Sequence, residues 1–455
     1  MQNGDYGGGS ENTRLDGALS LDFKRHDGML DLVIRRARRP HDERPVDIGM
    51  DAGRVVAVEP ALDASAAEEL DAQGRLVTPP FVDSHFHLDA VLTAGTPRRN
   101  ASGTLLEGIS LWAELQPLLT HEGMVERARE YLRWCVSQGI LALRSHVDIC
   151  QASLLGLRAL IEVRDELRDV IDVQLVAFPQ HGLLRFPDGE RLLDEALDLG
   201  VDVVGGIPHY ERTREEGLES VRLLMARAQR RGLAVDMHCD ETDDPSSRFV
   251  ETLATEVLAR GMEGRVAGSH LTSLHSVDNA YFAKLIGLLV EADLHVVSNP
   301  LLNMITQARA DVYPKRRGLT RVKELMDAGL NVSFGHDCTL DPWYPLGAAD
   351  MLDVAYMGLH ACQMSGEHEL PKIFDAITVN GATTLGLEGY GLEPGCRADA
   401  VVLDAQDVTD ALRTRPARME VVRAGRVIAR STAPRRELLC GELAGEVVFR
   451  KPAFR

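Results

Sequence analysis

Histidine and aspartate residues follow several of the short apolar runs in this 455-residue chain. His85 and His87 are two positions apart, so on an extended chain their side chains point to the same side and can bind one metal ion. His238 and Asp337 follow two later runs and complete a set of three imidazoles and one carboxylate. Nitrogen and oxygen ligands without a thiolate suit Zn²⁺ or Fe²⁺ and do not choose between them. The sequence therefore predicts a divalent metal site, although His85 and His87 alone could equally be a hydrogen-bonded surface pair.

The scarcity of lysine favours a single metal. Some metallohydrolase barrels bridge two metals with a carboxylated lysine on the fourth strand. Here the fourth apolar run is followed by Pro208-His209-Tyr210, and no lysine occurs between Lys24 and Lys284. A bridging carbamate is therefore excluded at that position, whereas a bridging carboxylate remains open.

Three further residues could move protons at such a site. A catalytic metal lowers the pKa of a bound water to about 7, and attack of hydroxide on an sp² carbon then needs proton transfer. Glu241, three residues after His238, can protonate a ring nitrogen, and Asp337 can take the proton of the water. His270 can polarise that water, while we expect only a structural or supporting role for His146. The simpler alternatives are a solvated loop acid for Glu241 and a buried structural histidine for His270.

Eight short apolar runs alternate with amphipathic stretches in the middle of the chain. The runs occupy residues 80–84, 140–145, 173–178, 201–207, 234–237, 266–269, 295–298 and 331–335. The amphipathic stretches include residues 124–137, 153–167, 190–199, 218–231, 277–292 and 320–328. This alternation predicts a (β/α)₈ TIM-like barrel, in which chemistry lies at the C-terminal ends of the strands. The alternative is an open, doubly wound sheet.

Both ends of the chain instead show strand-like segments between glycine turns. These segments occupy residues 30–34, 46–48, 54–58 and 75–77, and then 400–403, 419–423, 425–429 and 446–449. We therefore expect residues 26–78 and 391–455 to form one small β-sandwich domain, and residues 79–390 to form the barrel. Residues 1–25 begin with a polar, glycine-rich stretch, so we expect a disordered tail there.

The composition excludes several classes of partner. The chain has 50 Lys+Arg against 69 Asp+Glu, a formal net charge of −19, which argues against nucleic acid or an anionic membrane as the main partner. No apolar run reaches the length of a membrane span. The seven cysteines are scattered and include no CxxC pair, so they form no disulfide framework and favour a cytoplasmic protein.

Several stretches around the candidate residues resemble bacterial cytosine deaminase, a family of the amidohydrolase superfamily. The resemblance covers residues 75–430, with the blocks in matching order. The blocks are Pro79-Pro80-Phe81-Val82 through His85-Phe86-His87-Leu88-Asp89, Ser102-Gly103-Thr104-Leu105, Phe178-Pro179-Gln180, His238-Cys239-Asp240-Glu241, Tyr313-Pro314-Lys315-Arg316-Arg317-Gly318, Phe334-Gly335-His336-Asp337 and Asp341-Pro342-Trp343-Tyr344-Pro345-Leu346-Gly347. Agreement in so many blocks is far more specific than one His-x-His pair.

The resemblance implies roles for the residues around the metal. It implies one Zn or Fe ion held by the four ligands named above, with His270 beside the metal water and Glu241 as the proton shuttle to the ring. Gln180 would bind the amide edge of a pyrimidine, Trp343 would wall the pocket, and Leu105 would also contact the substrate. Without the resemblance, Gln180 is an ordinary loop amide and Trp343 is a core aromatic residue.

The implied reaction is the hydrolytic deamination of a small nucleobase. Hydroxide adds to C4 of a cytosine, ammonia leaves and a uracil-type base remains. Members of the family often form homo-oligomers, although no feature of this sequence requires one. The alternatives are another small heterocycle, such as isoguanine or creatinine, and a non-catalytic binding scaffold, against which the complete set of ligands argues.

One residue departs from the family pattern. Cytosine deaminases usually carry a second aspartate after the ligand aspartate, and this chain has Cys338. A cysteine behaves as a small, mostly uncharged hydrophobe, so the wall beside C5 of the ring would be roomier and less polar. Such a wall would admit 5-methylcytosine or another 5-substituted cytosine, whereas a neutral exchange would leave cytosine as the substrate. His181, after Gln180, is a second unusual residue without a clear consequence.

Overall fold

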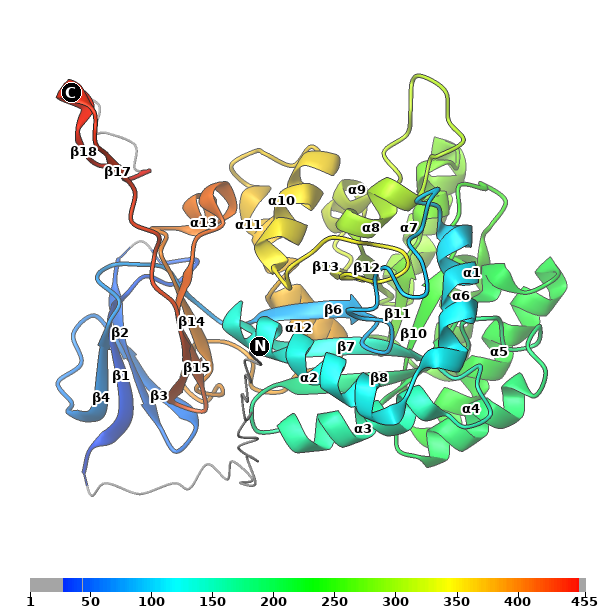
Figure 1. Ribbon diagram of the computed structural model, residues 1–455, viewed down its shortest axis with the longest axis horizontal. Coiled ribbons are helices and arrows are strands. Elements are labelled where there is room, and N and C mark those ends of the chain that lie inside the picture. The colour runs from blue at the N-terminus through cyan, green and yellow to red at the C-terminus, as the bar shows by residue number, and fades with distance from the viewer. Residues whose placement is uncertain (1–27, 43, 450–455) are drawn as a thin grey trace, which may run out of the picture.

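The computed structural model describes residues 28–42 and 44–449 of the chain. The predicted disordered tail, residues 1–25, lies outside the described residues. The described chain contains an eight-stranded sheet surrounded by helices, with smaller sheets packed at one end of it (Figure 1).

The eight-stranded sheet closes into a barrel. Its strands, paired in parallel and in chain order, are β6 Phe81–Phe86, β7 Ile140–Asp148, β8 Asp172–Phe178, β9 Val203–Gly206, β10 Ala234–Cys239, β11 Val266–His270, β12 His295–Ser298 and β13 Val332–Phe334. A parallel bridge between Phe86 and Asp337 joins the chain after the last strand to the first strand. Nearly every strand residue is buried, as the continuous apolar runs predicted. The TIM-like barrel is therefore confirmed, and the alternative of an open sheet is wrong.

The helices of the described chain mostly cover the outside of the barrel or extend its loops, except those after residue 400, which lie among the C-terminal strands. They are α1 Leu105–Leu115, α2 His121–Ser137, α3 Leu155–Leu167, α4 Gly189–Asp198, α5 Arg214–Arg231, α6 Phe249–Arg260, α7 Asn279–Glu291, α8 Pro300–Thr306, α9 Val322–Asp327, α10 Met351–Ala361, α11 Leu370–Asp375, α12 Val379–Leu385 and α13 Val408–Thr414, with short 3₁₀ turns η1 Gln116–Leu118, η2 Pro208–Tyr210, η3 Thr272–His275 and η4 Gly441–Leu443. Helix α5 shows why such segments begin and end where they do. The Thr213 hydroxyl accepts the Glu216 N–H at its start, and Gly232 ends it with φ of 69°.

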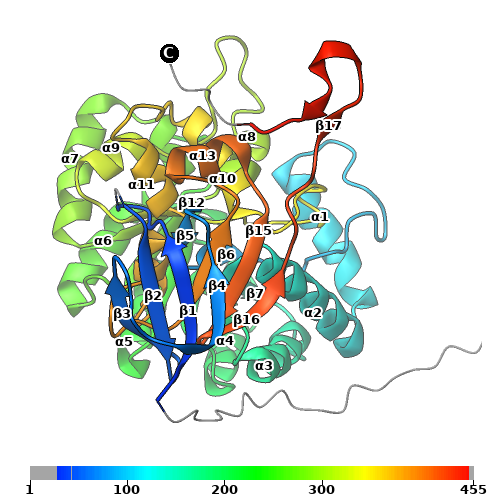
Figure 2. The same cartoon turned by 90° about the vertical axis from the view of Figure 1, so that its left-hand side faces the viewer.

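Two four-stranded sheets from the two ends of the chain pack against each other (Figure 2). One contains β1 Leu30–Ala37, β2 Val46–Asp51, β3 Arg54–Glu59 and β4 Ala66–Asp71, and the other contains β5 Val77–Thr78, β14 Ala400–Leu403, β15 Arg418–Arg423 and β16 Arg426–Arg430. Their shared core joins Leu32 and Ile48 to Val402 and Val422. The prediction that both chain ends build one β-rich unit is thus confirmed, while the exact domain limits stay predictions.

The C-terminal part of the described chain extends beyond these sheets. Strands β17 Glu437–Leu438 and β18 Gly445–Glu446 form a short hairpin, and the strand predicted over residues 446–449 is wrong beyond Glu446. Among the described helices, none has the combination of length and apolar character needed to span a membrane.

Candidate active site

Three of the predicted metal ligands lie where the barrel closes. The His87 N–H donates to the Asp337 carbonyl (3.1 Å), and the Asp337 N–H donates to the His85 carbonyl (2.8 Å). Asp337 has φ of 70°, a left-handed conformation that aspartate adopts more readily than most residues. Its Oδ1 lies 3.6 Å from Nε2 of His85 and 3.6 Å from Nε2 of His87. Closure of the barrel therefore brings the carboxylate to the two imidazoles.

The fourth predicted ligand, His238, lies at the end of β10 and faces His87. The two Nε2 atoms are 3.1 Å apart. Burial lowers the pKa of His87 to about 3 and, together with neighbouring imidazoles, lowers the pKa values of His85 and His238 well below the usual range. Neutral imidazole is the form that binds a metal. Two neutral rings whose nitrogens face each other at this distance suit a shared cation.

Several buried polar atoms at this place have no hydrogen-bond partner. They include His85 Nε2, His238 Nδ1, His270 Nε2, Asp337 Oδ2 and both ring nitrogens of His146. Buried polar atoms in folded proteins nearly always have partners, and here the possible ligand atoms of His85, His87 and Asp337 lie within 4.8 Å of one another. Burial raises the pKa of Asp337 well above its usual range, a penalty that a divalent cation would offset. The residues present therefore fit a divalent metal.

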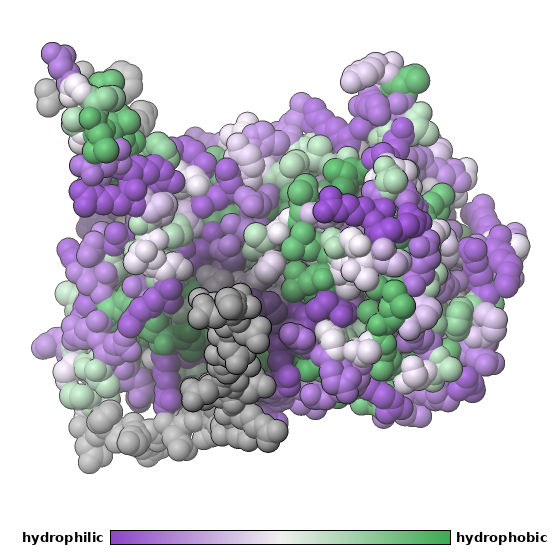
Figure 3. Space-filling model, viewed as in Figure 1, coloured by the Kyte–Doolittle hydropathy of each residue, from purple (hydrophilic) through white to green (hydrophobic). Residues whose placement is uncertain are grey.

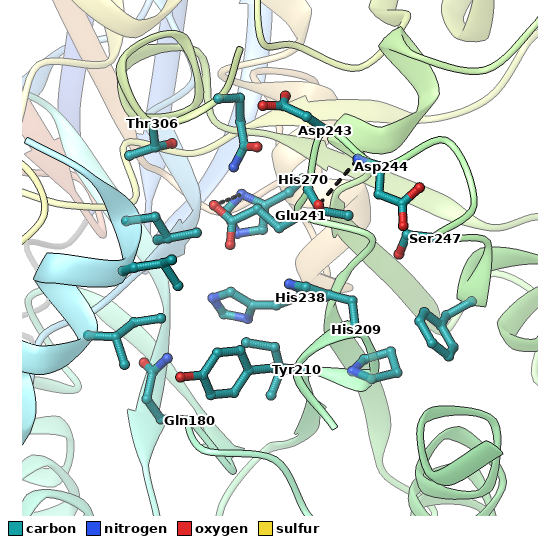
Figure 4. A pocket seen from close by; sticks show the side chains of 18 of the residues that line it. Gln180, His209, Tyr210, His238, Glu241, Asp243, Asp244, Ser247, His270 and Thr306 are labelled. Carbon is teal, nitrogen blue, oxygen red and sulfur yellow. Dashed lines mark hydrogen bonds and ion pairs between the residues drawn. The ribbon is translucent and has the colours of Figure 1, made fainter. Parts of the chain in front are cut away.

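Glu241 and His270 lie side by side in the site (Figure 4). Glu241 Oε1 is 3.5 Å from His270 Nδ1, and burial raises the pKa of Glu241 to about 8. Glu241 is thus mostly protonated at neutral pH and can donate a proton. The Asn303 amide donates to His270 Nδ1 (3.0 Å), and the Asn299 amide approaches the same nitrogen (3.3 Å). His270 therefore accepts at Nδ1 and carries its own proton on Nε2.

One cavity of about 690 Å³ opens at this end of the barrel. The predicted site residues that line it are His87, Leu105, Gln180, His238, Glu241, His270, Asp337, Cys338 and Trp343. Of the residues predicted to bind the metal or the substrate or to move a proton, only His85 does not line the cavity, and it is fully buried. His181 lies outside the set of lining residues and stacks on Phe186. The structure therefore brings together the residues that the sequence placed at separate strand ends.

Sequence reasoning missed part of the cavity wall. His209 and Tyr210, in η2 directly after β9, line the cavity, and the Tyr210 hydroxyl points toward Gln180 (Figure 4). Their position after the fourth apolar run was the signal that could have found them. Asn303, whose amide donates to His270, lies in the short helix α8. The two residues are 33 positions apart in the sequence, so no local sequence pattern indicates Asn303.

An apolar wall borders the cavity beside Asp337, because the Cys338 thiol lies 3.6 Å from Asp337 Oδ1. Cys338 and Trp343 pack with Ile109 and Leu302 in one hydrophobic cluster. Burial raises the pKa of the Cys338 thiol well above its usual range, so the thiol is neutral. A Cβ at Gly108 would lie 2.2 Å from Trp343 Cδ1. Helix α1 therefore needs glycine at this position to let the indole lie against its backbone.

The sequence and the structure are similar to those of several known proteins. The model of the amidohydrolase family matches residues 68–429. The structure is similar to the crystal structure of 5-methylcytosine deaminase from Klebsiella pneumoniae liganded with 5-fluorocytosine, with 43% identity, a TM-score of 0.86 and coverage of 88% of this chain and 98% of that chain. The sequence is 28% identical to N-isopropylammelide isopropyl amidohydrolase from Pseudomonas sp., over 88% of this chain and 97% of that protein. It is also 28% identical to pterin deaminase from Rhizobium rhizogenes, over 86% of this chain and 90% of that protein.

Proposed function

Because the chain belongs to the amidohydrolase family, we propose that it is a metal-dependent deaminase of 5-substituted cytosines, with 5-methylcytosine as its preferred substrate. The products would be thymine and ammonia, and cytosine itself would be a poorer substrate. The observation that carries the proposal is the neutral, buried Cys338 in the apolar wall beside the histidine and aspartate cluster. The similarity to the Klebsiella 5-methylcytosine deaminase supports the same substrate.

The metal would be held by His85, His87, His238 and Asp337. Their buried, unpartnered atoms and the 3.1 Å separation of the two facing imidazole nitrogens support this set. A single Zn²⁺ or Fe²⁺ bound there would supply hydroxide at neutral pH, because a catalytic metal lowers the pKa of a bound water to about 7.

The substrate ring would lie between polar and apolar walls of the cavity. Gln180 would bind the amide edge of the pyrimidine, with Tyr210 close beside it. Trp343 and Leu105 would contact the ring and exclude water from it. Cys338 would face the substituent at C5, since it lies in the same apolar cluster as Trp343. In this arrangement, C4 would face the histidine and aspartate cluster.

Proton transfers by the chain's own side chains would then complete the reaction. Glu241, protonated at neutral pH, donates to the ring nitrogen next to C4 and makes C4 a better electrophile. Asp337 would take one proton of the attacking water and deliver it to the amino group. The Glu241 carboxylate would take the remaining hydroxyl proton, so that the C4–N bond breaks, the C4 carbonyl forms and ammonia leaves. His270, with its proton on Nε2, stabilises the negative charge that develops on the added oxygen.

A second candidate is the deamination of another amino-substituted heterocycle. The cavity of about 690 Å³ has more room than one pyrimidine ring needs, and one similar protein is a pterin deaminase. Isoguanine, creatinine and pterins are therefore the relevant competitors.

A substrate panel tests the proposal. Metal-reconstituted protein is assayed for ammonia release from 5-methylcytosine, cytosine, isoguanine, creatinine and a pterin, and kcat/KM is compared. We expect the highest value for 5-methylcytosine. Turnover of another heterocycle, with no turnover of cytosine or 5-methylcytosine, would contradict the substrate assignment. Protein without stoichiometric metal and without turnover would support a binding scaffold instead.

A further inference from the structure

A chain of buried hydrogen bonds runs beneath the metal site, from Arg144 to His85. Arg144 Nη1 donates to Asp236 Oδ2 (2.9 Å), and the Ser269 hydroxyl donates to Asp236 Oδ1 (2.6 Å). Ser269 Oγ is in turn 3.0 Å from His85 Nδ1. The four residues come from four different strands, β7, β10, β11 and β6, and all are at most 2% exposed. This row of hydrogen bonds therefore crosses the interior of the barrel without contact with solvent.

The chemistry of the groups decides the direction of each hydrogen bond. A guanidinium can only donate, and the carboxylate of its ion pair accepts. Ser269 has a single hydroxyl proton, and the short hydrogen bond to Asp236 Oδ1 uses it. The lone pairs of Ser269 Oγ then face His85, so His85 Nδ1 must carry a proton and donate it. His85 Nε2, which has no hydrogen-bond partner, is left with a free lone pair toward Asp337 and His238.

Within residues 28–42 and 44–449, no other hydrogen bond to His85 Nδ1 or to the Ser269 hydroxyl competes with these two. The ring of His146 packs against that of His85, with centroids 4.1 Å apart. Its closest approach to Asp236 is 3.8 Å, which is beyond hydrogen-bond distance. His146 therefore supports the ring of His85 by packing, and it does not compete with His85 in this hydrogen-bond network.

The ion pair at the far end of this chain is difficult to explain by stability alone. A fully buried Arg–Asp pair loses hydration that its mutual attraction rarely repays. Arg144 is held rigidly, because its remaining donors bond Gln174 Oε1 and the Thr384 carbonyl. A fixed cation of this kind keeps Asp236 oriented as an acceptor toward Ser269.

We propose that Ser269, backed by Asp236 and Arg144, is a positioning residue that locks His85 in the Nδ1–H tautomer and so presents Nε2 to the divalent metal. The inference rests on the ligand set given under the proposed function, and not on the identity of the heterocycle. It assigns a purpose to the buried ion pair, since the pair orders a metal ligand through one hydroxyl.

Metal affinity of serine variants tests this role. The Zn²⁺ dissociation constant is measured by chelator competition, and bound metal by elemental analysis. We expect Ser269→Ala to bind Zn²⁺ about 10- to 100-fold more weakly than the unmodified protein, and Ser269→Thr, which keeps the hydroxyl, to recover most of the affinity. Ser298→Ala is the matched control, because Ser298 is also a fully buried serine on the next strand but its Oγ has no partner.

Nitrogen-15 NMR of histidine-labelled protein provides a readout that needs no variant. In the unmodified zinc-loaded protein, we expect His85 to show a protonated Nδ1 and a metal-bound Nε2. A proton on Nε2 of His85, or equal Zn²⁺ affinity in Ser269→Ala and the unmodified protein, would overturn the inference. Weak Zn²⁺ binding by the unmodified protein would instead contradict the proposed metal site.

Discussion

The two ends of the barrel differ in whether their buried polar groups have partners within the protein. At the C-terminal end, atoms of His85, His238, His270 and Asp337 are buried without hydrogen-bond partners. At the N-terminal end, where the β-rich unit packs, Arg423 pairs with Asp172, the first residue of β8, and with Asp399. Arg418 likewise pairs with Asp350. These buried arginines of the N-terminal end are therefore paired within the folded chain, whereas the unpartnered atoms of the C-terminal end are those that a bound cation would satisfy.

The largest effect is expected from removing a ligand at the C-terminal end. His238→Ala should lower kcat/KM for the best substrate by at least about 10³-fold, because the metal is lost together with the hydroxide it supplies. Metal content and turnover are measured on the same preparation. His181→Ala, a histidine outside the cavity, is the control and should keep both. Full metal content in His238→Ala would show that the unpartnered atoms have another purpose.

A smaller loss is expected when only the proton donor is removed. Glu241→Gln should keep the metal and lower kcat by about 10²- to 10⁴-fold, because the amide cannot give a proton to the ring. Elemental analysis and steady-state kinetics separate this variant from the ligand variant. Unchanged turnover would remove Glu241 from the mechanism.

The N-terminal end should respond in stability and not in chemistry. Arg423→Ala removes a buried cation from Asp172 and Asp399 and leaves Arg397 as their shared partner. We expect the free energy of unfolding to fall by about 3 kcal/mol. Urea unfolding measures the loss, while kcat/KM of the folded protein should stay within about twofold. Arg129→Ala, which breaks an exposed pair with Glu166, should destabilise the protein by less than about 1 kcal/mol. A large catalytic defect in Arg423→Ala would contradict the view that the N-terminal end contributes to stability and not to catalysis.

The apolar wall should control selectivity with little effect on the metal. Cys338→Asp should shift the ratio of kcat/KM values toward cytosine by about tenfold, because a carboxylate disfavours a methyl group at C5. Cys338→Ala removes the sulfur without adding charge and should keep the preference for 5-methylcytosine. The same ratio in both variants would reject the role of the wall.

The smallest effect is expected from pH. The pKa of Glu241 is raised to about 8 by burial, so the acid that donates to the ring is present below pH 8 and is lost above it. Raising the pH from 7 to 8 should therefore roughly halve kcat/KM, with a steeper fall beyond. A flat profile up to pH 9 would show that the protonated form of Glu241 is not required in the free enzyme.

Much of the fold could be predicted because the barrel strands are buried along their whole length. Continuous apolar runs mark such strands, and the limits predicted for β12 and β14 are those observed. Strand β4 was missed, because most of its side chains are exposed and only its parallel pairing with β1 defines it. A pattern of hydrophobicity cannot reveal a strand that is held mainly by backbone hydrogen bonds.

The sequence by itself determined which groups could bind a metal, and that His85 and His87 project to the same side, because side chains alternate along a strand. It also identified the family through several separate blocks. Only the tertiary structure decided that Asp337 meets these imidazoles where the barrel closes, and that Ser269 orients one of them. Burial raises the pKa of Glu241 and leaves the candidate ligand atoms without hydrogen-bond partners. Burial depends on every strand of the barrel together.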